Sequence, residues 1–155
     1  MTDAPNSPPP VPFGLHDAAA LAQVEVSYAF YSSRTGAGRQ ELTISGAGVV
    51  TLFFSRNYKD PQPQVRTGAT PPGLVLRLLD VMQCRGFLDL DEVQAGPEHA
   101  HARRTVRLRL PGAEKTVHLD HPGVYAVEQI VGAIVLTAAY ALPEVLGHRF
   151  FPNLG

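Results

Sequence analysis

The amino-acid sequence predicts an α+β domain, in which an antiparallel sheet of about five strands is covered on one face by two helices. Several stretches alternate apolar and polar residues with a period of two and are joined by short links, as in half-buried hairpin strands. Apolar residues at helical spacing between Leu74 and Met82 predict an amphipathic helix. The longest apolar run, Val124 to Leu142, predicts a second helix that is hydrophobic on nearly all sides. The expected order is strand, strand, strand, helix, strand, strand, helix.

Residues 1–22 are predicted to be a Pro-rich N-terminal arm, which is either a solvated tail or a docking segment. Its prolines favour an extended polyproline conformation, and Phe13 and Leu15 are expected to pin its end to the domain. The arm lacks the basic first region and continuous apolar core of a signal peptide. We therefore expect a cytoplasmic protein with one α+β domain over residues 23–143.

Three strands are expected before the first helix. Residues 24–31 and 41–45 alternate apolar and polar side chains, whereas residues 49–55, VVTLFFS, are apolar on both faces. The Gly-Ala-Gly sequence at 46–48 predicts a tight reversal, so the second and third strands form a hairpin. Residues 56–68 are polar and contain two prolines, and they are predicted to be a loop.

The first helix is expected to begin near Thr70, whose hydroxyl can cap it, with Pro71 in its first turn. It ends at Gly86, which suits a left-handed C-terminal cap. A second loop covers residues 91–102, and residues 103–119 then form a hairpin around Pro111-Gly112. The tail, residues 144–155, contains Phe150 and Phe151. We expect both to dock on the domain, because two adjacent exposed phenylalanines would promote aggregation.

This arrangement resembles small bacterial domains of the emfourin type. The resemblance depends on Gly36-Ala37-Gly38 after the first strand, Gly86-Phe87 after the helix, and the hairpin that carries Arg107 and Arg109. It covers about Val24 to Leu142, and the 56–68 loop, the N-terminal arm and the tail have no counterpart. Emfourin inhibits metalloproteases, so the resemblance implies an inhibitor-like, non-enzymatic protein, and it assigns no role to an individual residue.

Composition excludes several classes of function. The formal net charge of −1 argues against a generic nucleic-acid binder and a polybasic membrane anchor. The uncharged part of the long apolar run, Ile130 to Leu142, is too short to span a bilayer. The single cysteine, Cys84, excludes an intramolecular disulfide and suits a reducing compartment. No membrane span and no cofactor are therefore expected.

Histidines are the first candidates for chemistry. With Asp120 or Glu98 they provide enough ligands for a metal ion, and a small metal-dependent hydrolase using His118 and His121 is the enzymatic alternative. Their spacing matches no zinc-binding motif, and the competing interpretation is that all are solvent-exposed surface residues. The histidines in question are His99, His101, His118 and His121.

Other catalytic groups lack partners in the sequence. Cys84 has no nearby base and is predicted to be a small core residue near the helix flank. Ser45 does not lie in a nucleophile elbow, and the glycines at 36–38 lack the lysine of a phosphate loop. The acidic run 89–92 is typical of a solvated turn. We therefore predict that the protein is not an enzyme.

The face of the sheet that the helices leave open is a candidate binding surface. It is expected to show Tyr31, Arg107 and Arg109, with Arg103 and Arg104 extending a basic stripe, and Arg and Tyr are enriched where proteins bind one another. Two alternatives remain: an RNA-binding sheet in which Tyr28 or Tyr31 stacks a base, and an ordinary solvated face whose arginines pair with Glu25 and Glu41.

The long apolar helix supplies a second candidate surface. Ile130, Ile134 and Thr137 share one side of it, and Gln129, Leu136 and Tyr140 share another. The side that the sheet does not bury needs another protein or a second copy of the chain to cover it. We therefore predict a protein-binding module, an accessory, inhibitor-like or assembly component, with a structural homo-oligomer as alternative. The expected partner-binding residues are Tyr31, Arg103, Arg107, Arg109, Leu136, Tyr140, Phe150 and Phe151.

Overall fold

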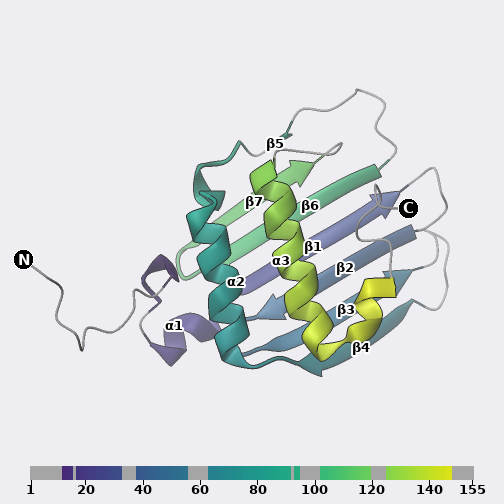
Figure 1. The fold of residues 1–155 in the computed structure, drawn as a ribbon, viewed down its shortest axis with the longest axis horizontal. Helices are drawn as coiled ribbons and strands as arrows, with labels where there is room; N and C mark the ends of the chain where they lie inside the picture. The colour runs from purple at the N-terminus through teal and green to yellow at the C-terminus, as the bar shows by residue number, and fades with distance from the viewer. Residues whose placement is uncertain are drawn as a thin grey trace, which may run out of the picture.

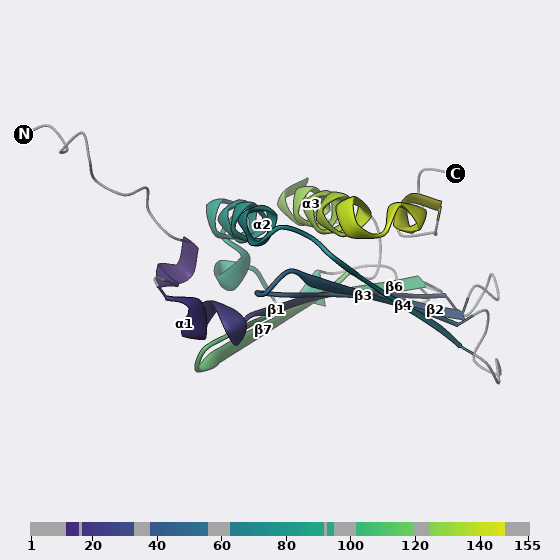
Figure 2. The same ribbon diagram turned by 90° about the horizontal axis from the view of Figure 1, so that it is seen from below.

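In the computed structural model, a twisted sheet forms one layer and two helices form a second (Figures 1 and 2). The structure describes residues 12–15, 17–32, 38–55, 63–91, 93–94, 102–119 and 125–147. The sheet order is β4-β3-β2-β1-β6-β7-β5. All neighbouring strands are antiparallel except β5, which pairs in parallel with β7. The strands are β1 (Glu25–Ser32), β2 (Gly38–Ser45), β3 (Val49–Ser55), β4 (Gln64–Ala69), β5 (Val93–Gln94), β6 (Ala102–Leu110) and β7 (Ala113–Leu119).

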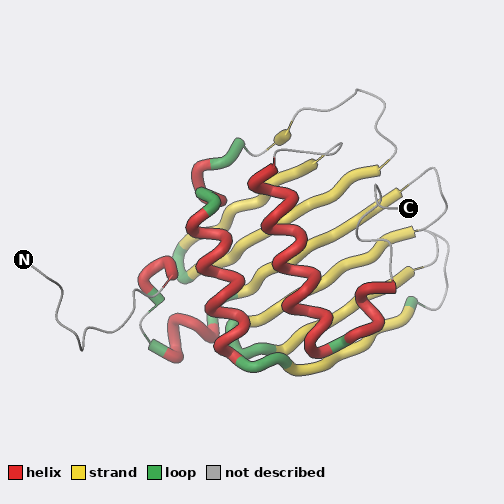
Figure 3. The backbone as a smooth tube through the Cα atoms, viewed as in Figure 1, coloured by secondary structure: helices red, strands yellow, loops and turns green. Residues whose placement is uncertain are grey.

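The two long helices lie side by side over the same face of the sheet and cross its strands obliquely (Figures 2 and 3). They are α2 (Pro72–Cys84) and α3 (Tyr125–Ala141). The short helix α1 (Ala18–Ala22) precedes β1, and single turns are formed by η1 (Pro12–Gly14), η2 (Phe87–Asp89) and η3 (Pro143–Gly147). No described helix covers the opposite face of the sheet. The predicted α+β class, the antiparallel sheet and the helix layer are confirmed.

Period-two alternation places the core between the sheet and the helices. On β1, Val26 and Tyr28 are fully buried, and their partners Ile44 and Leu42 on β2 are buried with them. Helices α2 and α3 close this core with residues at helical spacing. Their buried apolar residues are Val75, Leu78, Leu79, Met82, Val127, Ile130, Val131, Ile134, Val135 and Ala138.

Strand β4 corrects the sequence prediction, because five of its six residues, 64–68, belong to the segment 56–68 that was expected to be a loop. Its sequence, QVRTGA, has no apolar alternation, and nearly all of its residues are exposed. Backbone pairing along its whole length with residues 49–54 of β3 therefore forms this strand, and side-chain burial contributes little. Gly68 marks the close approach of α3, since a Cβ there would lie 3.0 Å from the carbonyl oxygen of Ala141. The described sheet thus has six long strands and the short β5, where about five were expected.

The start of α2 also differs from the prediction. Pro71 is the N-cap residue and Pro72 the first helical residue, and no side chain caps the helix. Thr70, the expected cap, is buried, and its hydroxyl has no hydrogen-bond partner among the described residues. The C-terminal end agrees with the prediction, because Gly86 adopts the left-handed conformation (φ 67°).

The predicted reversal between β2 and β3 packs against two other segments. A Cβ on Gly46 would lie 1.7 Å from the carbonyl oxygen of Leu21, and a Cβ on Gly48 would lie 2.1 Å from that of Thr70. Gly48 also has a φ of +93°, which L side chains rarely adopt. Both glycines are therefore required by contacts between distant parts of the chain.

The described end of the N-terminal segment packs on the domain. Leu15 is buried, and the backbone N–H of Phe13 donates to Oε1 of Gln83 on α2 at 3.1 Å. The carboxylate of Asp17 accepts a hydrogen bond from the N–H of Ala20 at 2.6 Å and so caps α1. After α3, Val145 in η3 is fully buried. Within the described residues, no helix is both long and apolar enough to cross a membrane.

Candidate functional site: a groove between the two long helices

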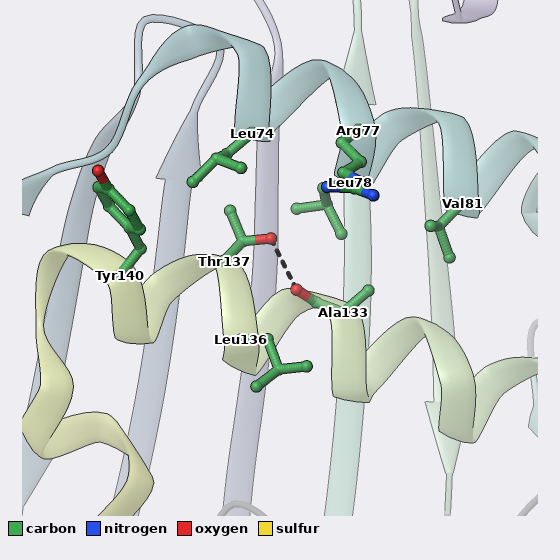
Figure 4. Close-up of a pocket in the computed structure, with 8 residues that line it drawn as sticks. All are labelled: Leu74, Arg77, Leu78, Val81, Ala133, Leu136, Thr137 and Tyr140. Carbon is green, nitrogen blue, oxygen red and sulfur yellow. Dashed lines mark hydrogen bonds between the residues drawn. The ribbon is translucent and has the colours of Figure 1, made fainter.

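A groove of about 380 Å³ lies between α2 and α3 on the outer surface of the helix layer (Figure 4). Each helix contributes four residues at positions i, i+3, i+4 and i+7, so the groove follows both helix axes for about two turns. The residues from α2 are Leu74, Arg77, Leu78 and Val81, and those from α3 are Ala133, Leu136, Thr137 and Tyr140.

The two sides of the groove differ in chemistry. On α3, Leu136 and Tyr140 are 67% and 63% exposed, and they lie one helical turn apart. On α2, Arg77 is exposed and makes no ion pair with any described residue. Between them the side chains are small or aliphatic. The groove is therefore an apolar channel with a cation on one side that pairs with no described carboxylate.

The polar groups of the groove leave little for catalysis. The hydroxyl of Thr137 donates to the carbonyl oxygen of Ala133 at 2.7 Å, so it is satisfied by its own helix (Figure 4). Among the eight lining residues there is no carboxylate, histidine or thiol to act as a base or nucleophile. Binding of an apolar surface is what this arrangement favours.

The sequence identified two of the groove residues, Leu136 and Tyr140, from the helical periodicity of α3. That periodicity assigned Ile130, Ile134 and Thr137 to the other side. Ile130 and Ile134 are fully buried in the structure, but Thr137 lines the groove. Arg77 was missed, because a single arginine on the polar side of an amphipathic helix has no distinguishing signal. Only the packing of α2 beside α3 places Arg77 next to exposed apolar groups.

The open face of the sheet carries the expected arginines, and they are paired. Arg107 lies 2.9 Å from a carboxylate oxygen of Glu25 and also donates to the hydroxyl of Ser27 at 3.3 Å. Arg109 lies 3.2 Å from a carboxylate oxygen of Glu114. Both arginines are partly exposed. These pairs favour the interpretation of this face as a solvated surface over a basic recognition stripe.

Other predicted members of that face are distributed differently. Glu41 pairs with Arg39 of its own strand at 2.6 Å, instead of with an arginine of β6. Tyr31 and Arg103 are Cα partners on β1 and β6, and the structure describes only their backbone. Phe150 and Phe151 also lie outside the described residues.

Two residues assigned to the open face by the sequence interpretation instead face the helices. Arg104 is buried beneath α3, where its guanidinium donates two hydrogen bonds to the carboxylate of Glu128. Tyr28 is fully buried beside it. Arg104 therefore does not extend a basic stripe, and Tyr28 is not available to stack a base. The sequence contained a signal for this position, because Arg104 lies on the same face of the strand as Val106 and Leu108. The single carboxylate of α3, Glu128, was the second signal.

The buried cluster shifts the acidity of its members. Burial raises the pKa of the Tyr28 hydroxyl, although the Arg104 charge and a hydrogen bond from Arg104 oppose this effect. Burial alone would lower the pKa of Arg104, but the hydrogen bonds to Glu128 and the neighbouring charges raise it above its ordinary value. At neutral pH the cluster therefore contains a charged pair and a neutral phenol.

Stability is expected to decrease at alkaline pH because of Tyr28. The unfolded chain releases this proton near the ordinary pKa of 10.0, whereas the folded chain retains it. Above that pH the folded state binds more protons than the unfolded state, so the free energy of unfolding decreases as pH rises. We expect a loss of about 1.4 kcal/mol per pH unit from this residue above pH ~10. Urea unfolding at a series of pH values will measure it, with Tyr28→Phe as the control that lacks this slope. Parallel curves for the two proteins would contradict the assignment.

The remaining chemical candidates do not assemble within the described residues. His118 is half-buried on β7, and its Nδ1 lies 3.0 Å from the hydroxyl oxygen of Thr105. His99, His101 and His121 lie outside the described residues, and within those residues no three metal-binding side chains come together. Cys84 is exposed at the end of α2, which corrects its predicted place in the core.

No protein-family model and no curated protein matches this chain. The emfourin-type resemblance therefore stays a prediction.

Proposed function

We propose that this protein is a non-enzymatic protein-binding module that accepts an amphipathic helix of another protein in the groove between α2 and α3. The observation that carries the proposal is the pair of large apolar side chains, Leu136 and Tyr140, exposed beside an apolar channel. Helices commonly bind such grooves by inserting an apolar stripe. An accessory, inhibitor-like or assembly role would each use this surface.

We infer the features of the partner helix from the shape and charge of the groove. Two turns of groove, roughly 10 Å long, accommodate apolar residues at positions i, i+3, i+4 and i+7 of a helix that lies along α2 and α3. Leu136 and Tyr140 would contact this stripe, and aromatic residues are frequent among the residues that dominate binding energy. Arg77 requires a carboxylate on the side of the partner that faces α2, since opposite charges give an interface its specificity.

The proposal can be tested by selecting binders from a displayed library of amphipathic helical peptides with varied charge beside the apolar stripe. We expect Leu136→Arg to raise the dissociation constants of the selected peptides by roughly 30-fold or more, as for a central interface residue. Leu146→Arg is the matched control, because Leu146 is 61% exposed but lies in η3 away from the groove. Fluorescence anisotropy measures the dissociation constants, and circular dichroism checks folding. Peptides that bind the Leu136→Arg protein as tightly as the unchanged protein would disprove the proposal.

The charge preference has its own test. Peptides selected against the unchanged protein are expected to contain Asp or Glu at the position that faces Arg77, and peptides selected against Arg77→Glu are expected to contain Lys or Arg there. If groove-binding peptides show no preference, or the preference does not reverse, the groove keeps its role and the acidic partner is wrong.

A further inference from the structure

The two edges of the sheet differ within the described residues. On one side, β7 carries Glu114 and Lys115, and its last residues pair with the two-residue strand β5. Charged residues and very short strands are the devices by which proteins prevent sheets from joining at their edges. On the other side, β4 is a terminal strand of six residues, and it pairs with β3 in one unbroken register from end to end. No bulge interrupts β4.

The direction of the free backbone groups on β4 follows from its pairing. The N–H of Thr70 donates to the carbonyl oxygen of Gly48 at 2.8 Å, so this pair is hydrogen-bonded, as is every second pair along the ladder. The alternate residues, Val65, Thr67 and Ala69, therefore direct their N–H and C=O groups away from β3. No described strand pairs with these groups.

The side chains of these three residues are also suited to pairing. Val65 is 59% exposed, Thr67 and Ala69 are exposed, and all three are uncharged. Val and Thr are favourable strand residues. The one charge on β4 belongs to Arg66, which is opposite the buried Leu52 and so lies on the helix-covered face, 3.8 Å from Glu144.

We propose that β4 pairs antiparallel with β4 of a second copy of this chain, around a two-fold axis at Thr67, to form one continuous sheet. This register places Thr67 opposite Thr67 of the second copy and Val65 opposite Ala69 of the second copy, and cross-strand pairs of this kind are stabilising. Arg66 is opposite Gly68 of the second copy, which has no side chain. The two Arg66 side chains are diagonal neighbours across the axis on the helix-covered face, where Glu144 of the same chain, 3.8 Å from each, offsets the like charges. The strand therefore complements itself, as a two-fold interface requires.

The expected result is a full-length protein whose mass in solution, measured by light scattering over a range of concentrations, is that of two chains. Thr67→Lys places two like charges opposite each other on the axis and is expected to yield the mass of one chain. Thr51→Lys is the matched control: Thr51 is the partner of Thr67 on β3 and lies on the same face, one strand inside the edge, so dimers are expected to persist.

A second variant guards against a folding defect in the first. Thr67→Pro removes one outward N–H but leaves the hydrogen bonds to β3 intact, since proline is tolerated where the N–H of an edge strand faces solvent. It is also expected to be monomeric, with an unchanged circular dichroism spectrum. A single-chain mass for the unchanged protein, or a two-chain mass for both Thr67 variants, would overturn the proposal. Loss of the dimer in Leu136→Arg alone would assign self-association to the groove and also overturn it.

Discussion

Replacing Glu128 by alanine is expected to lower the free energy of unfolding by about 3 kcal/mol, the low end of the range for breaking a buried ion pair. The side chain of Arg104 is only 4% exposed, so removing Glu128 leaves its charge buried without the carboxylate that it contacts in the structure. The low end applies because the Glu128 side chain is 33% exposed and water already screens part of the pair. Urea unfolding at neutral pH measures the change.

Two variants make the Glu128 experiment specific. Glu41→Ala removes an exposed ion pair on the opposite face and is expected to cost less than about 1 kcal/mol. The double replacement of Arg104 by Met and Glu128 by Leu removes both charges and is expected to recover most of the loss. If Glu128→Ala costs no more than Glu41→Ala, the ion pair does not stabilise the contact between α3 and the sheet.

Replacing Gly48 by alanine is expected to cost about 3 kcal/mol, the sum of two physical penalties. One is the left-handed backbone at φ +93°, and the other is the contact of 2.1 Å between the new Cβ and the carbonyl oxygen of Thr70. Relief of that contact requires the turn before β3 to move away from the link between β4 and α2. The hydrogen bond from the N–H of Thr70 to the Gly48 carbonyl would weaken with it.

Gly112→Ala separates the two penalties. Gly112 has a φ of +75°, but a Cβ there meets nothing within 4 Å. Its replacement is therefore expected to cost only about 1 kcal/mol, the backbone penalty alone. Thermal unfolding of both variants gives the difference, which measures the packing contact. Equal losses of stability for Gly48→Ala and Gly112→Ala would mean that the turn before β3 moves away from Thr70 without lowering the free energy of unfolding.

Elements that bury apolar side chains could be predicted from the sequence. Strands β1, β2, β6 and β7 and helix α2 each show the apolar period that burial on one face imposes, and β3 and α3 are apolar over nearly their whole length. Strand β4 could not be found in this way, because its contribution is backbone hydrogen bonding along an edge and its side chains are exposed. The same absence of a side-chain pattern concealed the two-residue β5.

The candidate site was predictable only on one side. Periodicity in α3 separated Leu136 and Tyr140 from the buried Ile130 and Ile134, and their exposure agrees. The side formed by α2 depends on how the two helices pack, which no local pattern encodes. The buried pair of Arg104 and Glu128 is similar, since a charge is assigned to solvent by default and only its partner on another element shows otherwise.

The central position of β1 has a consequence for the order of folding. Its neighbour β2 follows immediately in sequence, but its other neighbour, β6, is distant: Glu25 and Arg107, which pair across them, are 82 positions apart. Closing a loop of this size lowers the chain entropy before the contacts between the strands stabilise the structure. Proteins with such pairings therefore fold slowly. During synthesis, β1 to β4 and α2 leave the ribosome before β6 exists. Until β6 arrives, the innermost strand of the finished sheet is an open edge.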